Sequence, residues 1–402
     1  MKISFIQPGR NNLKYLKWSY ESIRKNQGDH EVEICVADDA SSDGTWDWCK
    51  QMMDKDPLFK AIRNEGPTRL GHTILYDRLV NEVATSDICM IYHADMYLCP
   101  DALDEVEKHI KEKIIVSLTR IEPPLHPDGP EKMLMDFGIE PEEFKEDKLL
   151  EWFKDVQLNQ ATKVTEGIFA PWAFYKKDFQ EINGHDPLYA PQSKEDSDIF
   201  NRFQLNGIKF IQTWGGCVYH MTCRGSRFAD GAVRNPNGEV FMKNRETNEW
   251  LTQNQKATRN FIRKWGHFVK HDIFLKPIIP HKYDIGFIIK NCDIKILTGL
   301  EPWCSNVYVN PDLIKKYIST EQPNTTMDLY NRIKPYDNEK NNEILIRIDA
   351  KTLDPEDFKM LQILPEVIAE SGEVGEFELG NMNIHIININ TYENKLIICK
   401  KQ

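Results

Sequence analysis

The 402-residue sequence contains no apolar run of the roughly 18 residues that a membrane-spanning helix needs. Its first residues, 1–6, already read as a short strand, and they lack the long apolar region of a signal peptide. From these two absences we expect a protein without a transmembrane segment, located in the cytoplasm.

Cysteine is present but forms no pattern. There are nine cysteines, an odd number, and no CxxC pair occurs. Only Cys217 and Cys223 lie close together in the sequence. This distribution favours reduced thiols over a disulfide framework, and it predicts no zinc site.

Positive charge is also in short supply. The formal net charge is -11, with 51 Lys and Arg against 62 Asp and Glu. Such a chain is a poor candidate for general binding to nucleic acid or to anionic membranes. A local basic pocket for a diphosphate remains compatible with this charge, so we expect no nucleic-acid partner but keep anionic small molecules open.

The first part of the chain alternates short buried runs with amphipathic segments. Such a pattern predicts a parallel α/β sheet of the Rossmann-like kind, in which ligands lie beyond the carboxyl ends of the strands. Both Asp38-Asp39 and His93-Ala94-Asp95 follow such runs, so we expect them to share one site. The predicted strands cover residues 2–7, 32–37, 88–92 and 114–118, and helices are predicted at 13–25, from Thr45 and from about Pro100.

Later segments depart from this alternation. Residues 120–163 are rich in Pro and charged side chains and predict an insertion or lid, while 239–265 predict an amphipathic helix. Beyond about residue 273, apolar runs at 283–289, 344–348, 384–389 and 395–398, with a helix near 355–370, predict a smaller C-terminal α+β domain. We therefore expect a catalytic domain at 1–272 and a domain of unknown role at 273–402, with Trp303 and Cys304 in its core.

Two adjacent carboxylates, Asp38 and Asp39, repel each other unless a partner uses them. They can accept hydrogen bonds from a base or a ribose, whereas the competing structural interpretation is a helix cap and turn. Asp43, just before Gly44-Thr45, fits the capping interpretation. For Asp39 the two interpretations are equally supported by the residues alone.

A second group of polar residues combines imidazole and carboxylate. His93 and Asp95 at a strand end suit Mn²⁺ or a similar divalent ion, and the alternative is a solvated loop with a hydrogen-bonded histidine. His220 follows another buried run and precedes Arg224 and Arg227, a pattern that could hold a metal–diphosphate group.

Carboxylates also gather before the segment from Ile199 to Leu205, which is predicted to be helical. One of Glu195, Asp196 and Asp198 could act as a general base toward an acceptor hydroxyl. The alternative is that they only complement the positive end of the helix dipole.

The order of these motifs resembles the family 2 inverting glycosyltransferases of the GT-A (nucleotide-diphospho-sugar transferase) fold. The resemblance covers roughly residues 1–270 and begins with the opening strand and its Pro8 loop. It continues through the acidic turn at 36–45, His93-Ala94-Asp95 in place of DxD, Gly184-His185-Asp186 in place of Gly-Phe-Asp, the Glu195-Asp196 pair, and His220.

The resemblance implies a role for each matched residue. Asp39, with Asp38 near it, would contact the nucleotide base. Asp95 and His220 would bind the metal, with His93 as a further ligand or donor contact where the family has its first Asp. Asp196 would be the catalytic base, supported by Glu195. The remaining donor-binding candidates are Pro8, Arg69, Arg224 and Arg227.

The implied reaction is an inverting single displacement from a nucleoside-diphosphate sugar to the hydroxyl of a glycan or other acceptor. It would use Mn²⁺ or Mg²⁺, with a UDP-sugar as the favoured donor and a GDP-sugar as a second possibility. Oligomerisation is compatible with the sequence. The sequence departs from the family pattern at His93 and at His185, and the first departure leaves room for weak metal dependence.

Two other functions stay open. A sugar nucleotidyltransferase would share the sheet and a carboxylate-held metal, but Pro8 to Asn12 is only a faint version of its Gly-rich basic loop. A non-catalytic nucleotide- or sugar-binding protein of the same fold is supported by His93, and it is opposed by the presence of Asp95, Asp196 and His220.

Overall fold

The computed structural model describes residues 1–223, 227–228, 231–243 and 246–399. The chain forms two compact units, and each unit is built from more than one segment of the sequence. The first contains residues 1–252, 271–277 and the segment from Ile398, and the second contains 253–270 and 278–397. Because the units interleave around residues 253–277, the division into domains at 1–272 and 273–402 stays a prediction.

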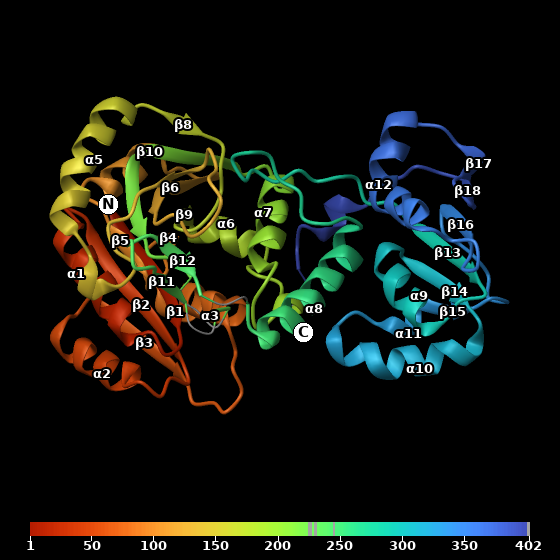
Figure 1. The fold of residues 1–402 in the computed structure, drawn as a ribbon, viewed down its shortest axis with the longest axis horizontal. Coiled ribbons are helices and arrows are strands. Elements are labelled where there is room, and N and C mark those ends of the chain that lie inside the picture. The colour runs from red at the N-terminus through yellow and green to blue at the C-terminus, as the bar shows by residue number, and fades with distance from the viewer. Residues whose placement is uncertain (224–226, 229–230, 244–245, 400–402) are drawn as a thin grey trace. The chain divides into compact units, whose positions relative to one another are not determined.

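The first unit is built on a ten-stranded mixed sheet (Figure 1). Its strand order is β3-β2-β1-β4-β9-β6-β10-β5, with β7 added beside β6 and β8 beside β10. The strands are β1 (Lys2–Gly9), β2 (Glu31–Asp39), β3 (Phe59–Asn64), β4 (Ile88–Ile91), β5 (Met96–Leu98), β6 (Ile114–Glu122), β7 (Lys132–Leu134), β8 (Val164–Thr165), β9 (Trp172–Tyr175) and β10 (Lys209–His220). The predicted Rossmann-like α/β fold and its early strands are confirmed.

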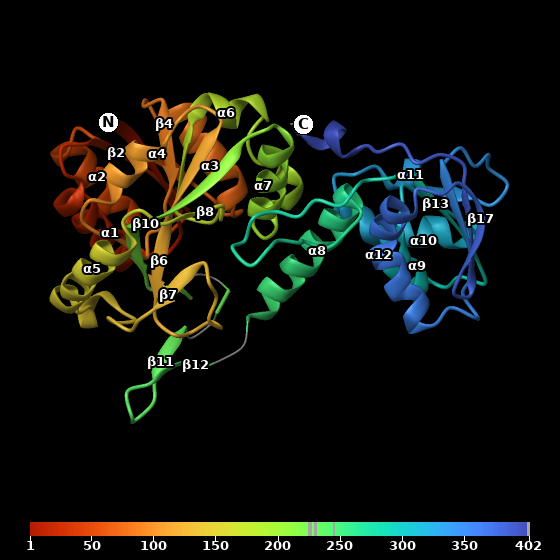
Figure 2. The same cartoon turned by 90° about the horizontal axis from the view of Figure 1, so that it is seen from above.

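Helices flank this sheet (Figure 2). In α1 the buried side chains recur at helical spacing, from Tyr15 and Leu16 to Ser19, Ser22 and Ile23, and the helix packs beside β5. The α2 helix packs on β3, and both α4 and α5 pack on β10. The helices are α1 (Leu13–Asn26), α2 (Thr45–Lys55), α3 (His72–Arg78), α4 (Ala102–His109), α5 (Glu146–Gln160), α6 (Lys176–Glu181) and α7 (Glu195–Leu205).

Strand direction explains why polar residues from distant parts of the sequence meet. Strands β1, β2 and β4 are parallel, β9 runs antiparallel to both β4 and β6, and β10 is parallel to β6. Their carboxyl ends therefore form one edge, with Gly9, Asp39, Ile91, Glu122 and His220 as the last residues. The short β5 is antiparallel to β10 and pairs Met96 with His220, which brings the preceding Asp95 to the same edge.

The predicted helix at 239–265 is partly wrong. Only α8 (Asn248–Trp265) is helical, because Val240–Met242 forms β12, a hairpin with β11 (Ala232–Arg234). The turn contains Asn237-Gly238, a dipeptide that strongly favours hairpins, and the amide of Asn235 donates to the carbonyl of Glu239 at 2.9 Å. Local turn chemistry thus ends the helical pattern.

The second unit has a six-stranded sheet of order β15-β14-β13-β16-β18-β17. The first four strands are parallel, and β18 is antiparallel to both β16 and β17. The elements are β13 (Ile285–Lys290), α9 (Ile294–Leu300), β14 (Asn306–Val309), α10 (Pro311–Glu321), α11 (Leu329–Arg332), β15 (Ile333–Pro335), β16 (Ile344–Asp349), α12 (Pro355–Ser371), β17 (Gly375–Leu379) and β18 (Met382–Ile386).

The helix predicted at 355–370 is confirmed as α12, which begins with a capping box between Asp354 and Asp357. Trp303 and Cys304 are buried in the core of this unit, as expected. The strand predicted at 395–398 is wrong, because Glu393–Leu396 forms a 3-10 turn. Among the described residues, none of the helices combines the length and apolarity that crossing a membrane requires.

Candidate active site

The carboxyl edge of the main sheet brings His93, Asp95 and His220 together. Each offers one ligand atom, and these atoms all lie within 4.8 Å of one another. The Asp95 Oδ2 and His220 Nε2 atoms are 3.4 Å apart, and the rings of His93 and His220 have centroids 5.7 Å apart. The structure thus places side by side the residues for which the sequence predicted a metal site.

Burial and mutual contact shift the pKa values of these three side chains. Burial lowers the pKa of His93 to about 3, so its ring is neutral and has lone pairs to offer. Burial tends to raise the pKa of Asp95, but the nearby His220 outweighs it and the value falls to about 2. Burial tends to lower the pKa of His220, whereas Asp95 and Glu122 raise it to about 9. At neutral pH the group thus holds a neutral imidazole, a carboxylate and a protonated imidazole, and a bound cation would take the place of the second His220 proton.

Sequence reasoning missed Glu122, the last residue of β6. Its Oε1 atom lies 2.8 Å from His220 Nδ1, and the residue is 2% exposed. Burial tends to raise its pKa, but Arg120 and His220 hold the value well below the usual range. A buried run that ends in a carboxylate is the same signal that drew attention to Asp39, and it could have revealed Glu122.

The start of α7 places the predicted base. Asp196 is exposed, whereas Glu195 is buried and its Oε2 atom has no hydrogen-bond partner among the described residues. Burial and the adjacent Asp196 raise the pKa of Glu195 to about 8. Desolvation also raises the pKa of Asp196, whereas the nearby His185 lowers it. Asp198 is instead structural, since it forms a fully buried ion pair with Arg202 at 2.7 Å.

Asp39 is almost fully engaged by its own chain. Its Oδ1 accepts from Asn64 Nδ2 at 2.7 Å and from the Leu70 amide at 3.0 Å, and its Oδ2 accepts from the Gly71 amide at 2.9 Å. Arg69 Nε lies 3.6 Å from Oδ2, while its Nη2 donates to Gln192 at 2.7 Å. Arg69 therefore links the end of β2 to the loop that precedes α7.

The other candidates near Asp39 have different surroundings: two are held by hydrogen bonds of the chain, and one lines a surface depression. Asp38 is fully buried, with Oδ1 accepting from the Ser41 amide and Oδ2 lying 3.4 Å from Arg63 Nε. Asp43 accepts from the amide and hydroxyl of Thr45, as the capping interpretation predicts. Pro8 lines a shallow depression together with Gln7, Asn12 and Ala37.

Helix α3 contributes a wall that the sequence did not reveal. The rings of His72 and Tyr76 have centroids 5.7 Å apart. Burial and the charges of Asp196, Glu195 and Asp95 raise the pKa of Tyr76 well above its usual value. The Tyr76 phenol is thus under the electrostatic influence of both Asp95 and the predicted base pair.

The predicted diphosphate ligands are described only in part. Arg224 lies outside the described residues. Arg227 is exposed, pairs with Glu246 at 2.7 Å and lies over the Trp250 ring at 5.2 Å. The structure therefore shows Arg227 engaged within its own segment.

A second group of possible metal ligands, His30, Asp104 and Glu107, is already paired with a cation. The amino group of Met1 lies 3.0 Å from both His30 Nδ1 and Glu107 Oε1. Asp104 Oδ1 lies 2.9 Å from His30 Nε2. These contacts give the cluster a structural explanation.

Known proteins are similar to the N-terminal part of this chain, which contains the candidate site. The family model for glycosyl transferase family 2 matches residues 4–182. A curated relative, the abequosyltransferase RfbV of Salmonella typhimurium, is 29% identical over 122 residues, which cover 29% of this chain and 35% of that protein. The chain thus matches about a third of the length of this relative.

Three solved structures are similar to part of this chain. GalNAc-T7 with UDP, GalNAc and Mn²⁺ has a TM-score of 0.42 at 13% identity, covering 55% of this chain and 44% of that one. S. aureus TarS 1-349 has a TM-score of 0.40 at 14% identity, with coverages of 56% and 61%. The mannosyltransferase PcManGT from Pyrobaculum calidifontis with GDP-Man and Mn²⁺ has a TM-score of 0.39 at 16% identity, with coverages of 55% and 57%.

The family match and the observed mixed α/β sheet agree with each other and with the motif order in the sequence. They confirm the expected GT-A fold class for the N-terminal part of the chain. Residues 4–182 therefore match the model of glycosyl transferase family 2.

Proposed function

We propose that this protein transfers a sugar from a nucleoside-diphosphate sugar to an acceptor hydroxyl by an inverting single displacement. The observation that carries the proposal is the grouping of His93, Asp95 and His220, whose ligand atoms lie within 4.8 Å of one another. The family match supports glycosyl transfer, as does a relative named as an abequosyltransferase.

The ligand atoms of the cluster fit a divalent cation. Two imidazole nitrogens and one carboxylate oxygen suit Mn²⁺ better than Mg²⁺, which prefers a shell of oxygen ligands. Such a cation supplies charge neutralisation for the leaving diphosphate. We therefore assign His93, Asp95 and His220 as its ligands, and we favour Mn²⁺ over Mg²⁺.

Asp196 is the residue best suited to accept the acceptor's proton. It is exposed, whereas the adjacent Glu195 is buried and retains its own proton because its pKa is raised. A neutral Glu195 avoids a second negative charge beside Asp196, which stays available as the carboxylate base. A single displacement needs no covalent nucleophile, so these side chains suffice for the protein's part in the reaction.

The donor side is assigned to the edge formed by β1 and β2. Pro8 and Asp38 lie at this edge, and Asp39 with Arg69 holds the loop from Asn64 to Gly71 against it. Since Asp39 already accepts three hydrogen bonds, its part in base recognition would include shaping this loop. Arg224 and Arg227 stay candidates for the diphosphate, and the glycan or other acceptor is unassigned.

A donor screen tests this function directly. Hydrolysis of UDP-, GDP- and CDP-sugars by the full chain is measured with Mn²⁺, with Mg²⁺ and with EDTA. We expect turnover of one donor class that Mn²⁺ stimulates most. If no donor is hydrolysed and no nucleotide binds in a metal-dependent way, the proposal is wrong. Metal-dependent binding without turnover or transfer would instead favour a non-catalytic binding protein.

The base is tested by Asp196→Asn, with Asp312→Asn on α10 as an exposed carboxylate control in the other unit. General-base catalysis contributes about 10²- to 10⁴-fold, so we expect transfer to fall by that factor while donor binding persists. Transfer within about threefold of the unmodified protein would show that the base is misassigned.

A further inference from the structure

The buried carboxylate of Glu122 lies beside the proposed metal ligand His220. Strands β6 and β10 are parallel and pair Ile121 with Tyr219, so the next residues, Glu122 and His220, are neighbours across the sheet. Their side chains meet at 2.8 Å between Glu122 Oε1 and His220 Nδ1. The contact is therefore set by the register of two long strands.

Two cations surround the same carboxylate. Lys132 Nζ on β7 lies 3.4 Å from Glu122 Oε2, and Arg120 Nε lies 3.5 Å from Oε1. The Lys132 side chain is only 7% exposed, and the Arg120 guanidinium lies over the Phe169 ring at 4.5 Å. With both cations in contact, Glu122 is a hydrogen-bond acceptor, and the His220 Nδ1 atom must be the donor.

The opposite nitrogen of His220, Nε2, consequently faces Asp95 and the proposed metal site. When a cation binds, His220 keeps its proton on Nδ1 and gives up the one on Nε2, whose lone pair then faces the cation. Nε2 is also the atom that lies 3.4 Å from Asp95 Oδ2. Carboxylates that accept from the second nitrogen of a ligating histidine fix both its tautomer and its ring orientation.

We infer that Glu122 is a positioning residue that holds His220 with Nε2 directed at the cation bound with Asp95 and His93. The inference rests on the proposed function, and it adds a residue outside the motifs that identify the family. Glu122 itself touches neither donor nor acceptor in this assignment. Its effect is on the affinity and geometry of the metal site.

The test is a Mn²⁺ titration of the full chain followed by electron paramagnetic resonance of free Mn²⁺. It is run with the metal alone and with the nucleoside diphosphate selected by the donor screen. Loss of an outer partner of a metal ligand typically weakens metal binding about 10- to 100-fold, and we expect this range for Glu122→Gln.

Glu33→Gln is the matched control. Glu33 is also a buried strand carboxylate, 4% exposed, and it pairs with Lys60, Ser4 and Thr85 rather than with a histidine. It should lower stability without changing Mn²⁺ affinity. If Glu122→Gln does not fold, Glu122→Asp serves instead, because it keeps the charge between Arg120 and Lys132 while withdrawing the oxygens from Nδ1.

Two further variants separate the failure of this inference from the failure of the proposed function. Asp95→Asn and His220→Ala should abolish Mn²⁺ binding if the metal site is assigned correctly. If they do so while both Glu122 variants bind Mn²⁺ within threefold of the unmodified protein, the positioning role is overturned and the metal site stands. If Asp95→Asn and His220→Ala leave Mn²⁺ affinity unchanged, or the unmodified protein binds no Mn²⁺, the metal site and this inference both fail.

Discussion

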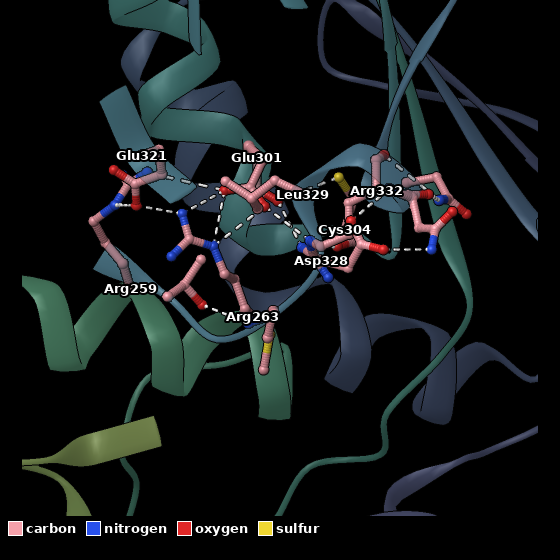
Figure 3. A network of polar contacts seen from close by, with 12 residues as sticks. Arg259, Arg263, Glu301, Cys304, Glu321, Asp328, Leu329 and Arg332 are labelled. Carbon is pink, nitrogen blue, oxygen red and sulfur yellow. Dashed lines mark hydrogen bonds and ion pairs between the residues drawn. The ribbon is translucent and has the colours of Figure 1, made fainter. Parts of the chain in front are cut away.

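Arg263 on α8 and Glu301 form a fully buried ion pair in the second unit, with 2.7 Å between Nη2 and Oε2 (Figure 3). Glu301 also accepts from Arg332 at 2.9 Å and from the Tyr317 hydroxyl at 3.0 Å. Glu301→Ala would remove the carboxylate that Arg263 and Arg332 share and leave Arg263 with Glu321 as a carboxylate partner. We therefore predict a loss of about 3 kcal/mol in the free energy of unfolding of this unit. Urea denaturation followed by hydrogen exchange in β13 and β16 measures it.

The stability that this ion pair contributes should depend on pH. Burial tends to raise the pKa of Glu301, but Arg332 and Arg263 outweigh it and lower the value to about 2. Its stabilisation is therefore complete above the ordinary pKa of 4.5 and is lost as pH falls toward 2. The exposed pair of Glu356 and Lys359 is the control, since Glu356→Ala should cost less than about 1 kcal/mol. A Glu301→Ala protein as stable as this control would contradict the prediction.

Replacement of the carboxylate by an amide should impair transfer much less at Glu195 than at Asp196. Because Glu195 is buried and its pKa is raised to about 8, it carries a proton at neutral pH, and glutamine resembles that form. We predict that Glu195→Gln keeps transfer within about tenfold, while Asp196→Asn loses about 10²- to 10⁴-fold. Single-turnover transfer at pH 7 compares them, and an equal loss in both variants would mean that the pair acts with both carboxylates ionised.

Asp39 should control the order of the loop from Asn64 to Gly71. Asp39→Ala removes three hydrogen bonds and leaves the Gly71 amide without its buried acceptor, so we predict a loss of about 2–3 kcal/mol. Amide hydrogen exchange at 64–71 should accelerate, whereas the exposed control Asp54→Ala should change neither quantity. Unchanged exchange in Asp39→Ala would show that the loop is held by other contacts.

The position of the candidate site could be predicted because strand ends are visible in the sequence. Runs that close with Asp39, Asp95 and His220 mark one edge once the strands are known to run in the same direction. Glu122 was missed because its importance depends on pairing between β6 and β10, which are 98 residues apart in sequence at this contact. The carboxylate at the end of a buried run was a local signal, but its pairing with His220 depends on this non-local register.

Local errors had equally physical causes. The apolar residues at 240–242 fit a helical period, but the Asn237-Gly238 turn pairs them with β11 instead. The apolar run at 395–398 is too short to distinguish a strand from a turn of helix, and Glu393–Leu396 forms a 3-10 turn. In both places a competing hydrogen-bond pattern decided the structure.

The last prediction concerns His185, which stands where the related family has Phe. Asp77 Oδ1 accepts from the His185 amide at 3.0 Å and lies 2.9 Å from its Nδ1, and the His185 ring stacks on Tyr76 with centroids 5.4 Å apart. His185→Phe keeps an aromatic ring against Tyr76 and removes the Nδ1 contact. We therefore expect a folded variant with active-site chemistry intact.

A double-mutant cycle with Asp77→Ala measures how strongly the two side chains are coupled. In the unmodified protein, Asp77→Ala leaves both the buried Nδ1–H and the amide unpaired, and we predict a loss of about 2–3 kcal/mol. In the His185→Phe background only the amide loses its acceptor, so the loss should be smaller by about 1 kcal/mol, within the usual range for contacting residues. Strictly additive losses in urea denaturation would mean that the His185 ring draws no stability from Asp77, and that its presence in place of Phe has another cause.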